Sequence, residues 1–331
     1  MKTMQYFTFH GNTLSRVALG CDHFGETIDA SVSWQNLDLF VQSGGTIIDV
    51  AHRYGQTGND TPSKSERTIG GWMKERGCRK KLFLATKGGH PDFDDPHRSR
   101  LDKGAVGRDI QGSLDDLQVD RVDLWYFHRD DESIPADELV DLANELILDK
   151  GYSRYLGASN WRASRIEQAN TWAKAHGRQP FVMSEIQASL AHCSPEQWGD
   201  DTLVCMNDQE MDWYSRHDIP VMCFSPQAKG LFSKKISGGQ LSQKAAMRFD
   251  TPQNRVLVPI VKQLAEKLDV PPAAIVTSYL LGFAHPTLIP IIGASKTSQL
   301  EDTLSHIDLR LDKEDLQLLV DARARSQDFR Q

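Results

Sequence analysis

The sequence contains few cysteines, and none of them are paired by spacing. Five thiols are scattered over 331 residues, at Cys21, Cys78, Cys193, Cys205 and Cys223, and no C-x-x-C motif occurs. A disulfide-stapled secreted domain has an even number of cysteines in a regular framework. The odd number and wide scatter are instead typical of reduced thiols, and we expect a cytoplasmic protein.

Excess positive charge and long apolar runs are also missing. Lys and Arg number 38 against 45 Asp and Glu, which gives a formal net charge of −7, and the pI is near 5.9. Nucleic-acid binding favours a basic patch, so this balance argues against such a partner. No apolar stretch reaches the length of about 18 residues that a spanning helix needs, and the first residues lack a basic segment followed by an apolar one. We therefore expect no membrane partner.

No Pro/Ser-rich linker or charge block divides the chain, so we expect a single domain over residues 1–331. Short, almost wholly apolar runs alternate with amphipathic segments from end to end, a pattern typical of strands alternating with helices. The predicted strands are eight, at residues 16–19, 46–49, 82–86, 122–128, 155–159, 182–187, 221–225 and 288–292.

Signals for the ends of helices agree with this periodicity. Gly44 and Gly151 follow amphipathic segments as helix stops. Thr251 and Pro252 are expected as the cap and first residue of one helix. That helix carries the apolar positions Leu257, Ile260, Val261, Leu264 and Leu268.

Eight strands that are apolar almost throughout, each followed by a helix, require a parallel sheet covered by helices. Eight such units predict a closed (β/α)8 TIM barrel of the α/β class. A doubly wound open sheet is the rival, but the turn after the first strand reads "GCDHFG", with only the outer glycines of a dinucleotide-binding loop. The opening "YFTFHGNTLSRV" (6–17) predicts a β-hairpin that closes the amino end of the barrel.

Ionisable residues follow three of the predicted strands. Asp49 comes after "TII", Lys87 after "LFLAT" and His128 after "DLWYF", while Tyr54 lies in the loop beyond Asp49. Because the carboxyl ends of barrel strands share one face, we expect these four side chains to meet there.

Such a group suits proton donation to an oxygen that is becoming an alkoxide. The pKa of a free phenol is about 10, which makes it a reluctant acid at neutral pH. We expect the ammonium of Lys87 to lower the pKa of Tyr54, and Asp49 to keep that ammonium charged. His128 is expected to hydrogen-bond the substrate oxygen and orient it.

Taken together, these residues and their surroundings resemble the aldo-keto reductase superfamily. The matching motifs are "GGTIIDVAHRYG", "LFLATKGG", "DLWYFHRDD", "YLGASNW", "SEIQASL", "FSPQAKGLFSKK" and "PIIGASKTSQLED". They occur in order over essentially the whole chain. The resemblance implies a barrel that binds NAD(P)H across its carboxyl-end face without a metal, and it matches Asp49, Tyr54, Lys87 and His128 to the family's catalytic tetrad.

The resemblance also implies the cofactor residues. Ser159, Asn160 and Gln187 match the side chains that hold the nicotinamide carboxamide, and Phe224 matches the ring that stacks on it. Ser225, Gln227 and Gly230 match the loop along the pyrophosphate, with Lys235 as a further candidate. Gly293, Ser295, Lys296 and Gln299 match the segment that contacts the adenosine 2′-phosphate. NADP(H) is favoured, with NAD(H) as the alternative, because Gln299 stands where many members have Arg.

For the substrate, we expect a small carbonyl compound. His23, Phe24, His90 and Trp161 are the predicted substrate contacts. A pocket that mixes aromatic rings with His, Asp and Arg suits a sugar-derived aldehyde or ketone better than a steroid or a fatty aldehyde. Composition and spacing give no oligomeric state.

Two other functions remain open at this stage. A metal-dependent hydrolase on the same barrel is suggested by His52, His90, His97, His128 and several aspartates, although no H-x-H motif follows the first strand. A barrel that holds NADP as a redox sensor and turns over slowly is the second alternative, against which the complete set of four ionisable residues argues.

Overall fold

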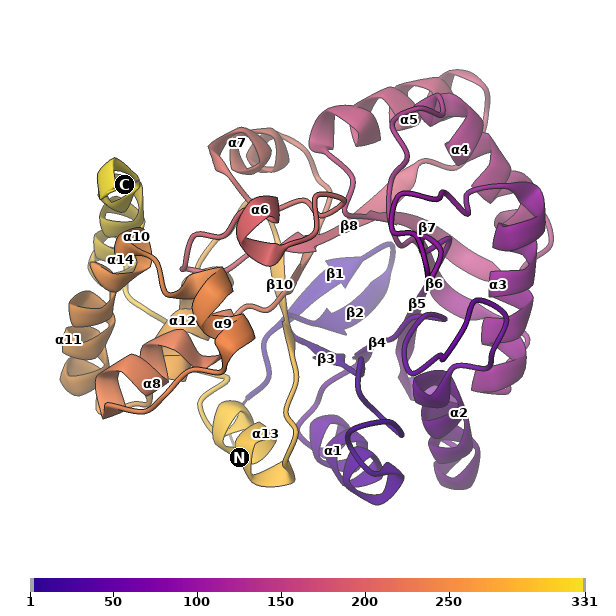
Figure 1. Ribbon diagram of the computed structural model, residues 1–331. Coiled ribbons are helices and arrows are strands. Elements are labelled where there is room, and N and C mark those ends of the chain that lie inside the picture. The colour runs from indigo at the N-terminus through magenta and orange to yellow at the C-terminus, as the bar shows by residue number, and fades with distance from the viewer. Residues whose placement is uncertain (1–2, 330–331) are drawn as a thin grey trace.

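The computed structural model describes residues 3–329 and has a closed barrel of eight parallel strands at its centre, with helices around it (Figure 1). The strand order around the barrel is β10-β3-β4-β5-β6-β7-β8-β9. The strands are β3 (Ala18–Gly20), β4 (Ile47–Asp49), β5 (Phe83–Gly88), β6 (Val122–Phe127), β7 (Ser153–Ser159), β8 (Phe181–Gln187), β9 (Val221–Phe224) and β10 (Leu288–Ile292). The expected barrel is confirmed, and each of the eight predicted strands matches an observed one within a few residues.

The helices cover the outside of the barrel. They are α1 (Ala30–Gln42), α2 (Lys64–Arg76), α3 (Lys103–Leu117), α4 (Ala136–Ala143), α5 (Ala163–Ala175), α6 (Pro195–Trp198), α7 (Asp208–Arg216), α8 (Leu231–Ser237), α9 (Gln243–Phe249), α10 (Pro252–Arg255), α11 (Val258–Leu268), α12 (Pro272–Leu281), α13 (Thr297–Leu304) and α14 (Lys313–Ser326). Their apolar faces and the outward side chains of the strands form the larger of two cores. None of the helices within residues 3–329 has the length and apolar character needed to cross a bilayer.

An antiparallel hairpin closes the amino end of the barrel. Its strands are β1 (Tyr6–Phe9) and β2 (Asn12–Ser15), and they precede β3 as predicted. The ring of Phe9 packs edge-on against Phe83 and Tyr155, with centroids 5.7 and 5.3 Å apart. Phe9 and Leu14 join the inward side chains of the strands in the second core, which fills the barrel.

One helix prediction is wrong in its extent. Thr251 caps a helix as expected, since its hydroxyl accepts a hydrogen bond from the backbone N–H of Asn254 at 3.3 Å. That helix, α10, ends at Arg255, and the apolar positions lie on the separate α11. Pro259 explains the break, because its ring has no N–H to donate and would clash with the preceding helical turn.

Candidate active site

The carboxyl ends of β4, β5 and β6 bring the four ionisable residues together. The Lys87 ammonium lies 2.6 Å from an Asp49 carboxylate oxygen and 5.3 Å from the centre of the Tyr54 ring. The rings of Tyr54 and His128 are 5.7 Å apart and nearly perpendicular. The four side chains thus form one cluster, in the arrangement that the strand ends predict.

Lys87 and Asp49 form a buried ion pair. Lys87 has no exposed surface and Asp49 is 3% exposed. Burial lowers the pKa of Lys87, but Asp49 and Glu185 raise it more, and the net pKa is well above the ordinary value. Burial raises the pKa of Asp49, and the Lys87 ammonium counters part of that rise. The lysine is therefore charged at neutral pH despite its position.

The balance at Tyr54 differs from the expectation. Burial raises the pKa of the phenol, Lys87 lowers it, and Asp49 and Glu185 raise it further, so that the net pKa lies above its ordinary value. The expectation that Lys87 lowers the net pKa is therefore wrong for this pocket. The contribution of Lys87 has the expected sign, but removal of the phenol from water outweighs it.

His128 is held in its neutral form. Burial lowers its pKa well below the usual value, and the nearby positive charges of Arg129 and Lys87 act in the same direction. Its Nδ1 has no hydrogen-bond partner among the described residues. A neutral imidazole can donate one hydrogen bond to a carbonyl oxygen, which is the task expected of it.

Glu185 joins this cluster, and the sequence reasoning missed it. Its carboxylate oxygen Oε1 lies 3.2 Å from the Lys87 ammonium, and the residue is 3% exposed. The signal was present, because Glu185 precedes Gln187 by two residues on β8 and both must point to the same side of the strand.

The side chains proposed to hold a nicotinamide carboxamide lie at the next two strand ends. Ser159 ends β7 and Gln187 ends β8. The Asn160 amide donates hydrogen bonds to the Ser159 hydroxyl at 3.1 Å and to the His128 carbonyl at 3.3 Å. Asn160 has a φ of 58°, a left-handed conformation that asparagine tolerates better than most residues. Ser159 and Asn160 therefore adjoin the ionisable cluster, while the Gln187 amide donates to the Ser189 hydroxyl at 3.3 Å.

The predicted pyrophosphate contacts after β9 differ in whether their side chains are already bonded within the protein. Phe224 ends β9 half-buried, with the ring of Trp198 5.5 Å away and nearly perpendicular to it. Ser225 and Gly230 lie in the loop that follows, each with positive φ. The side chain of Gln227 instead donates to the Thr277 hydroxyl on α12 at 3.2 Å.

Lys235 lies on α8 and is engaged elsewhere. Its ammonium is 2.7 Å from a carboxylate oxygen of Asp250, which also binds Arg255 at 2.8 Å. An ammonium paired in this way is not presented to a ligand. We therefore leave Lys235 out of the proposed cofactor site.

The segment after β10 leads into α13 and is exposed. Gly293, Ser295 and Lys296 precede the helix, and Lys296 is its N-terminal cap residue. The Ser295 hydroxyl donates to the side-chain oxygen of Gln299 at 3.1 Å. Lys296 forms no ion pair with any residue between 3 and 329, so its ammonium is available to an anion beside the helix N-terminus.

The predicted substrate contacts fall into two pairs. The His90 ring lies 4.7 Å from that of His128, and burial lowers its pKa to about 3, so it is neutral. His23 is about half exposed and lies 3.3 Å from Asp22. Phe24 and Trp161, by contrast, are 1% and 0% exposed in the outer core. Their rings have no free face for a ligand, and we leave both out of the proposed substrate site.

The four histidines that suggested a metal hydrolase do not form one group, although the rings of His90 and His128 lie side by side. Within the described residues, one group has the spacing to hold an ion, formed by His52, Glu66 and Asp116, and it includes one of the four histidines. Its carboxylates already accept hydrogen bonds, Glu66 from the Thr86 hydroxyl at 2.5 Å and Asp116 from Arg67 at 2.7 Å. This group belongs to the packing between the barrel and α2 and α3.

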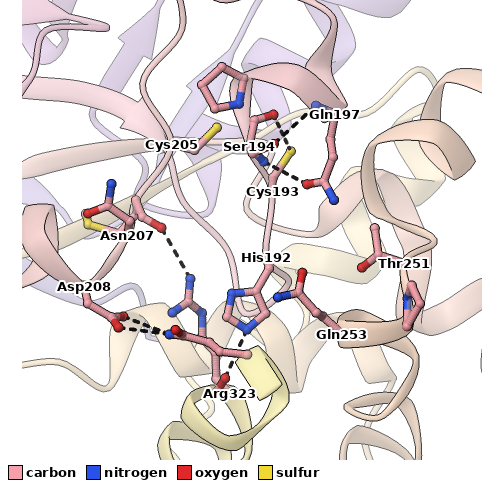
Figure 2. A pocket seen from close by; sticks show the side chains of 14 residues that line it. His192, Cys193, Ser194, Gln197, Cys205, Asn207, Asp208, Thr251, Gln253 and Arg323 are labelled. Atoms are coloured by element: carbon pink, nitrogen blue, oxygen red, sulfur yellow. Dashed lines mark hydrogen bonds between the residues drawn. The ribbon is translucent and has the colours of Figure 1, made fainter. Parts of the chain in front are cut away.

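A separate pocket of about 510 Å³ lies away from the cluster. Figure 2 shows it between the segment that contains α6, the start of α10 and the end of α14, with His192, Cys193, Cys205 and Arg323 pointing toward it. None of the four ionisable residues at the strand ends lines it. This pocket is thus not where the reactive side chains meet.

Comparison with known proteins identifies the family of the chain. The sequence profile of the Aldo/keto reductase family matches residues 16–324. The chain is 29% identical over 325 residues to the uncharacterized oxidoreductase YrpG of Bacillus subtilis (strain 168), covering 95% of each protein. It is 28% identical to norsolorinic acid reductase A of Aspergillus parasiticus, covering 94% of this chain and 78% of that one.

Two further matches are more distant. The chain is 24% identical to the aryl-alcohol dehydrogenase [NADP(+)] of Phanerodontia chrysosporium, covering 94% of this chain and 83% of that one. A crystal structure of the thermostable aldo-keto reductase Tm1743 superposes with a TM-score of 0.71 at 20% identity, covering 96% of this chain and all of the other. At that identity the superposition supports the fold.

Proposed function

Because the chain belongs to the aldo/keto reductase family, we propose that it reduces an aldehyde or ketone to an alcohol with NAD(P)H, with Tyr54 as the general acid. The whole of residues 1–331 is taken as one catalytic domain. The observation that supports this most strongly is the convergence of Tyr54, Lys87, Asp49 and His128 at the carboxyl ends of adjoining strands.

Each of the four side chains has a separate role in protonating a substrate oxygen. When bound, a reduced nicotinamide supplies the hydride to the carbonyl carbon. His128, neutral in its buried position, donates a hydrogen bond to the carbonyl oxygen and orients it. Tyr54 then gives up its phenolic proton to that oxygen. Lys87 favours the resulting phenolate, and Asp49 fixes the lysine in position.

The residues beside the cluster fit a nicotinamide dinucleotide. Ser159, Asn160 and Gln187 offer the paired donors and acceptors that a carboxamide requires, and the Phe224 ring suits stacking. The exposed ammonium of Lys296 at the start of α13 suits a phosphate. NADP(H) is therefore the proposed cofactor, in agreement with the name of the NADP(+)-dependent relative.

A small, polar carbonyl compound is the proposed substrate, with sugar-derived aldehydes and ketones first. His90 lies against His128, and Arg129 follows it in the chain with 8% exposure. We take the polar ring of His90, beside His128, as one side of the substrate pocket, and such a side suits a substrate with several hydroxyl groups better than an apolar one.

The proposal is tested by screening sugar-derived, aromatic and simple carbonyls with NADPH and NADH, following the loss of nicotinamide absorbance. We expect turnover with NADPH on at least one small polar carbonyl. Tight NADPH binding, read by quenching of tryptophan fluorescence, with no turnover on any compound would instead favour the redox-sensing alternative. Activity that is lost on chelation and does not need NADPH would favour a metal-dependent hydrolase.

A further inference from the structure

The charges around Lys87 do not balance if every carboxyl is ionised. Lys87 contributes one positive charge, while Asp49 at 2.6 Å and Glu185 at 3.2 Å would contribute two negative ones. All three side chains are buried. An uncompensated charge in such a site costs several kcal/mol in proteins. One proton added to the group removes the imbalance.

The contacts indicate where that proton lies. The second oxygen of Glu185, Oε2, is buried and has no hydrogen-bond donor among the described residues. The Glu185 carboxyl also lies within hydrogen-bonding reach of the Asp49 carboxyl. Two carboxylates cannot hydrogen-bond each other unless one is protonated. Asp49 has the shorter contact with the ammonium, which leaves Glu185 as the protonated partner.

We propose that Glu185 is a positioning residue that holds a proton against Asp49 at neutral pH, and so keeps the charge around Lys87 at zero beside Tyr54. This rests on the proposed carbonyl reduction for its catalytic meaning, but not for the protonation itself. Loss of the proton leaves a net negative charge next to Tyr54. That charge raises the pKa of the phenol and draws the Lys87 ammonium away from it, which makes Tyr54 a poorer acid.

Of Glu185 and the groups between residues 3 and 329 that face it, Glu185 is the one whose pKa lies just above neutrality. Burial, followed by the charge of Asp49, raises its pKa to about 8. Burial raises the pKa of Cys223 to about 12 and holds those of Tyr126 and Tyr54 above their ordinary values. The charged and titratable groups around Glu185 are Asp49, Tyr54, Lys87, Tyr126, Arg129 and Cys223.

The substitution Glu185→Gln keeps the shape of the side chain and fixes it in the neutral state. For wild-type enzyme we expect kcat to fall about tenfold between pH 7 and pH 9, as Glu185 ionises. For Glu185→Gln we expect kcat near pH 7 to be kept within about threefold and the fall at high pH to be under about twofold. A pH profile of the variant that overlays the wild-type profile would overturn the proposal.

Glu210→Gln is the matched control, because Glu210 is also buried, at 5% exposure, and also has a pKa raised by burial. It lies on α7 and accepts a hydrogen bond from the backbone of Ala163. Its replacement should leave the pH profile of kcat unchanged. A shift equal to that of Glu185→Gln would show that the effect is a general one of buried carboxyls, and would overturn the assignment.

Two readouts do not depend on turnover. The folded protein holds the Glu185 proton that the unfolded chain releases above its ordinary pKa of 4.5. The free energy of unfolding of wild type should therefore fall relative to Glu185→Gln as the pH rises from 4.5 to about 8. A constant difference across this range contradicts the proposal.

If Glu185→Gln does not fold, infrared spectra of the wild-type protein test whether the Glu185 carboxyl is protonated. A protonated carboxyl absorption that is present at neutral pH and fades near pH 8 supports the proposal, and a fully ionised set of carboxyls at neutral pH overturns it. Wild-type protein that turns over no carbonyl compound would defeat the proposed function, while these two readouts would still report on Glu185.

Discussion

The two ends of the barrel are built from the same strands but differ in what they bury. On β5, Phe83 near the start packs beneath the hairpin against Phe9 and Tyr155, while Lys87 near the end lies in a cluster of charges. The two positions are four residues apart and point to the same side of the strand. The amino end thus gains stability from apolar packing. The carboxyl end holds buried charges whose desolvation is costly, which is typical of a site kept for chemistry.

The largest expected effect is on turnover, from a substitution at the carboxyl end that removes the proton donor and keeps the packing. Tyr54→Phe deletes one hydroxyl, and we expect turnover to fall by roughly 10²–10⁴-fold, because the general acid is lost. Affinity for NADPH and the unfolding midpoint should stay close to wild type. Steady-state kinetics measure the turnover, and fluorescence titration measures the affinity for NADPH. A matching loss of NADPH binding would show that Tyr54 serves the cofactor instead.

The converse substitution damages the amino end. Phe9 is 4% exposed and contacts Phe83 and Tyr155. We expect Phe9→Ala to lower the free energy of unfolding by about 3–5 kcal/mol, through lost burial and the cavity left behind. The values of kcat and KM should hold at temperatures where the variant is folded.

Thr8→Ala on the exposed side of β1 is the control, and should change stability by less than about 0.5 kcal/mol. Denaturant titration measures both variants. If Phe9→Ala reduced turnover as strongly as Tyr54→Phe, the separation of the two ends would be wrong.

Sequence reasoning was strongest where a rule of the fold decides the position. Eight apolar runs with crossover helices leave few topologies, and the carboxyl ends of all the barrel strands lie at one face of the molecule. This is why Asp49, Lys87 and His128 were brought together correctly before any coordinates. Tyr54 followed because it lies five residues after Asp49 in the same loop.

Sequence reasoning was weaker where the outcome depends on a balance between burial and charge, or on the direction of one side chain. The net pKa of Tyr54 is set by burial against the charge of Lys87, and only distances and depth decide which is larger. Trp161 follows β7 by two residues, but its indole turns into the outer core, where it donates to the Arg129 carbonyl at 3.2 Å. Residue types and spacing predict neither the net pKa of Tyr54 nor the direction of the Trp161 side chain.

At the rim of the carboxyl end, charges should matter for the cofactor rather than for the fold. Lys296→Ala removes an exposed ammonium at the start of α13. A hydrogen bond to a charged group contributes about 1.5–3 kcal/mol, so we expect NADPH to bind roughly 10- to 100-fold more weakly. NADH, which lacks the 2′-phosphate, should bind as before. Lys313→Ala on α14 is the control. If the ratio of the Kd for NADPH to the Kd for NADH did not change in Lys296→Ala, the 2′-phosphate would be bound elsewhere.

The smallest effect is expected from another lysine at that end. Lys235 is one-third exposed and pairs with Asp250, which keeps Arg255 as a second partner. Exposed ion pairs contribute between 0 and about 1 kcal/mol, so Lys235→Ala should cost less than that in unfolding free energy and leave the Kd for NADPH unchanged. Tenfold weaker NADPH binding at unchanged stability would return Lys235 to the cofactor site. Together with Lys296→Ala, this variant separates a lysine whose partner lies within the protein from one whose proposed partner is the ligand.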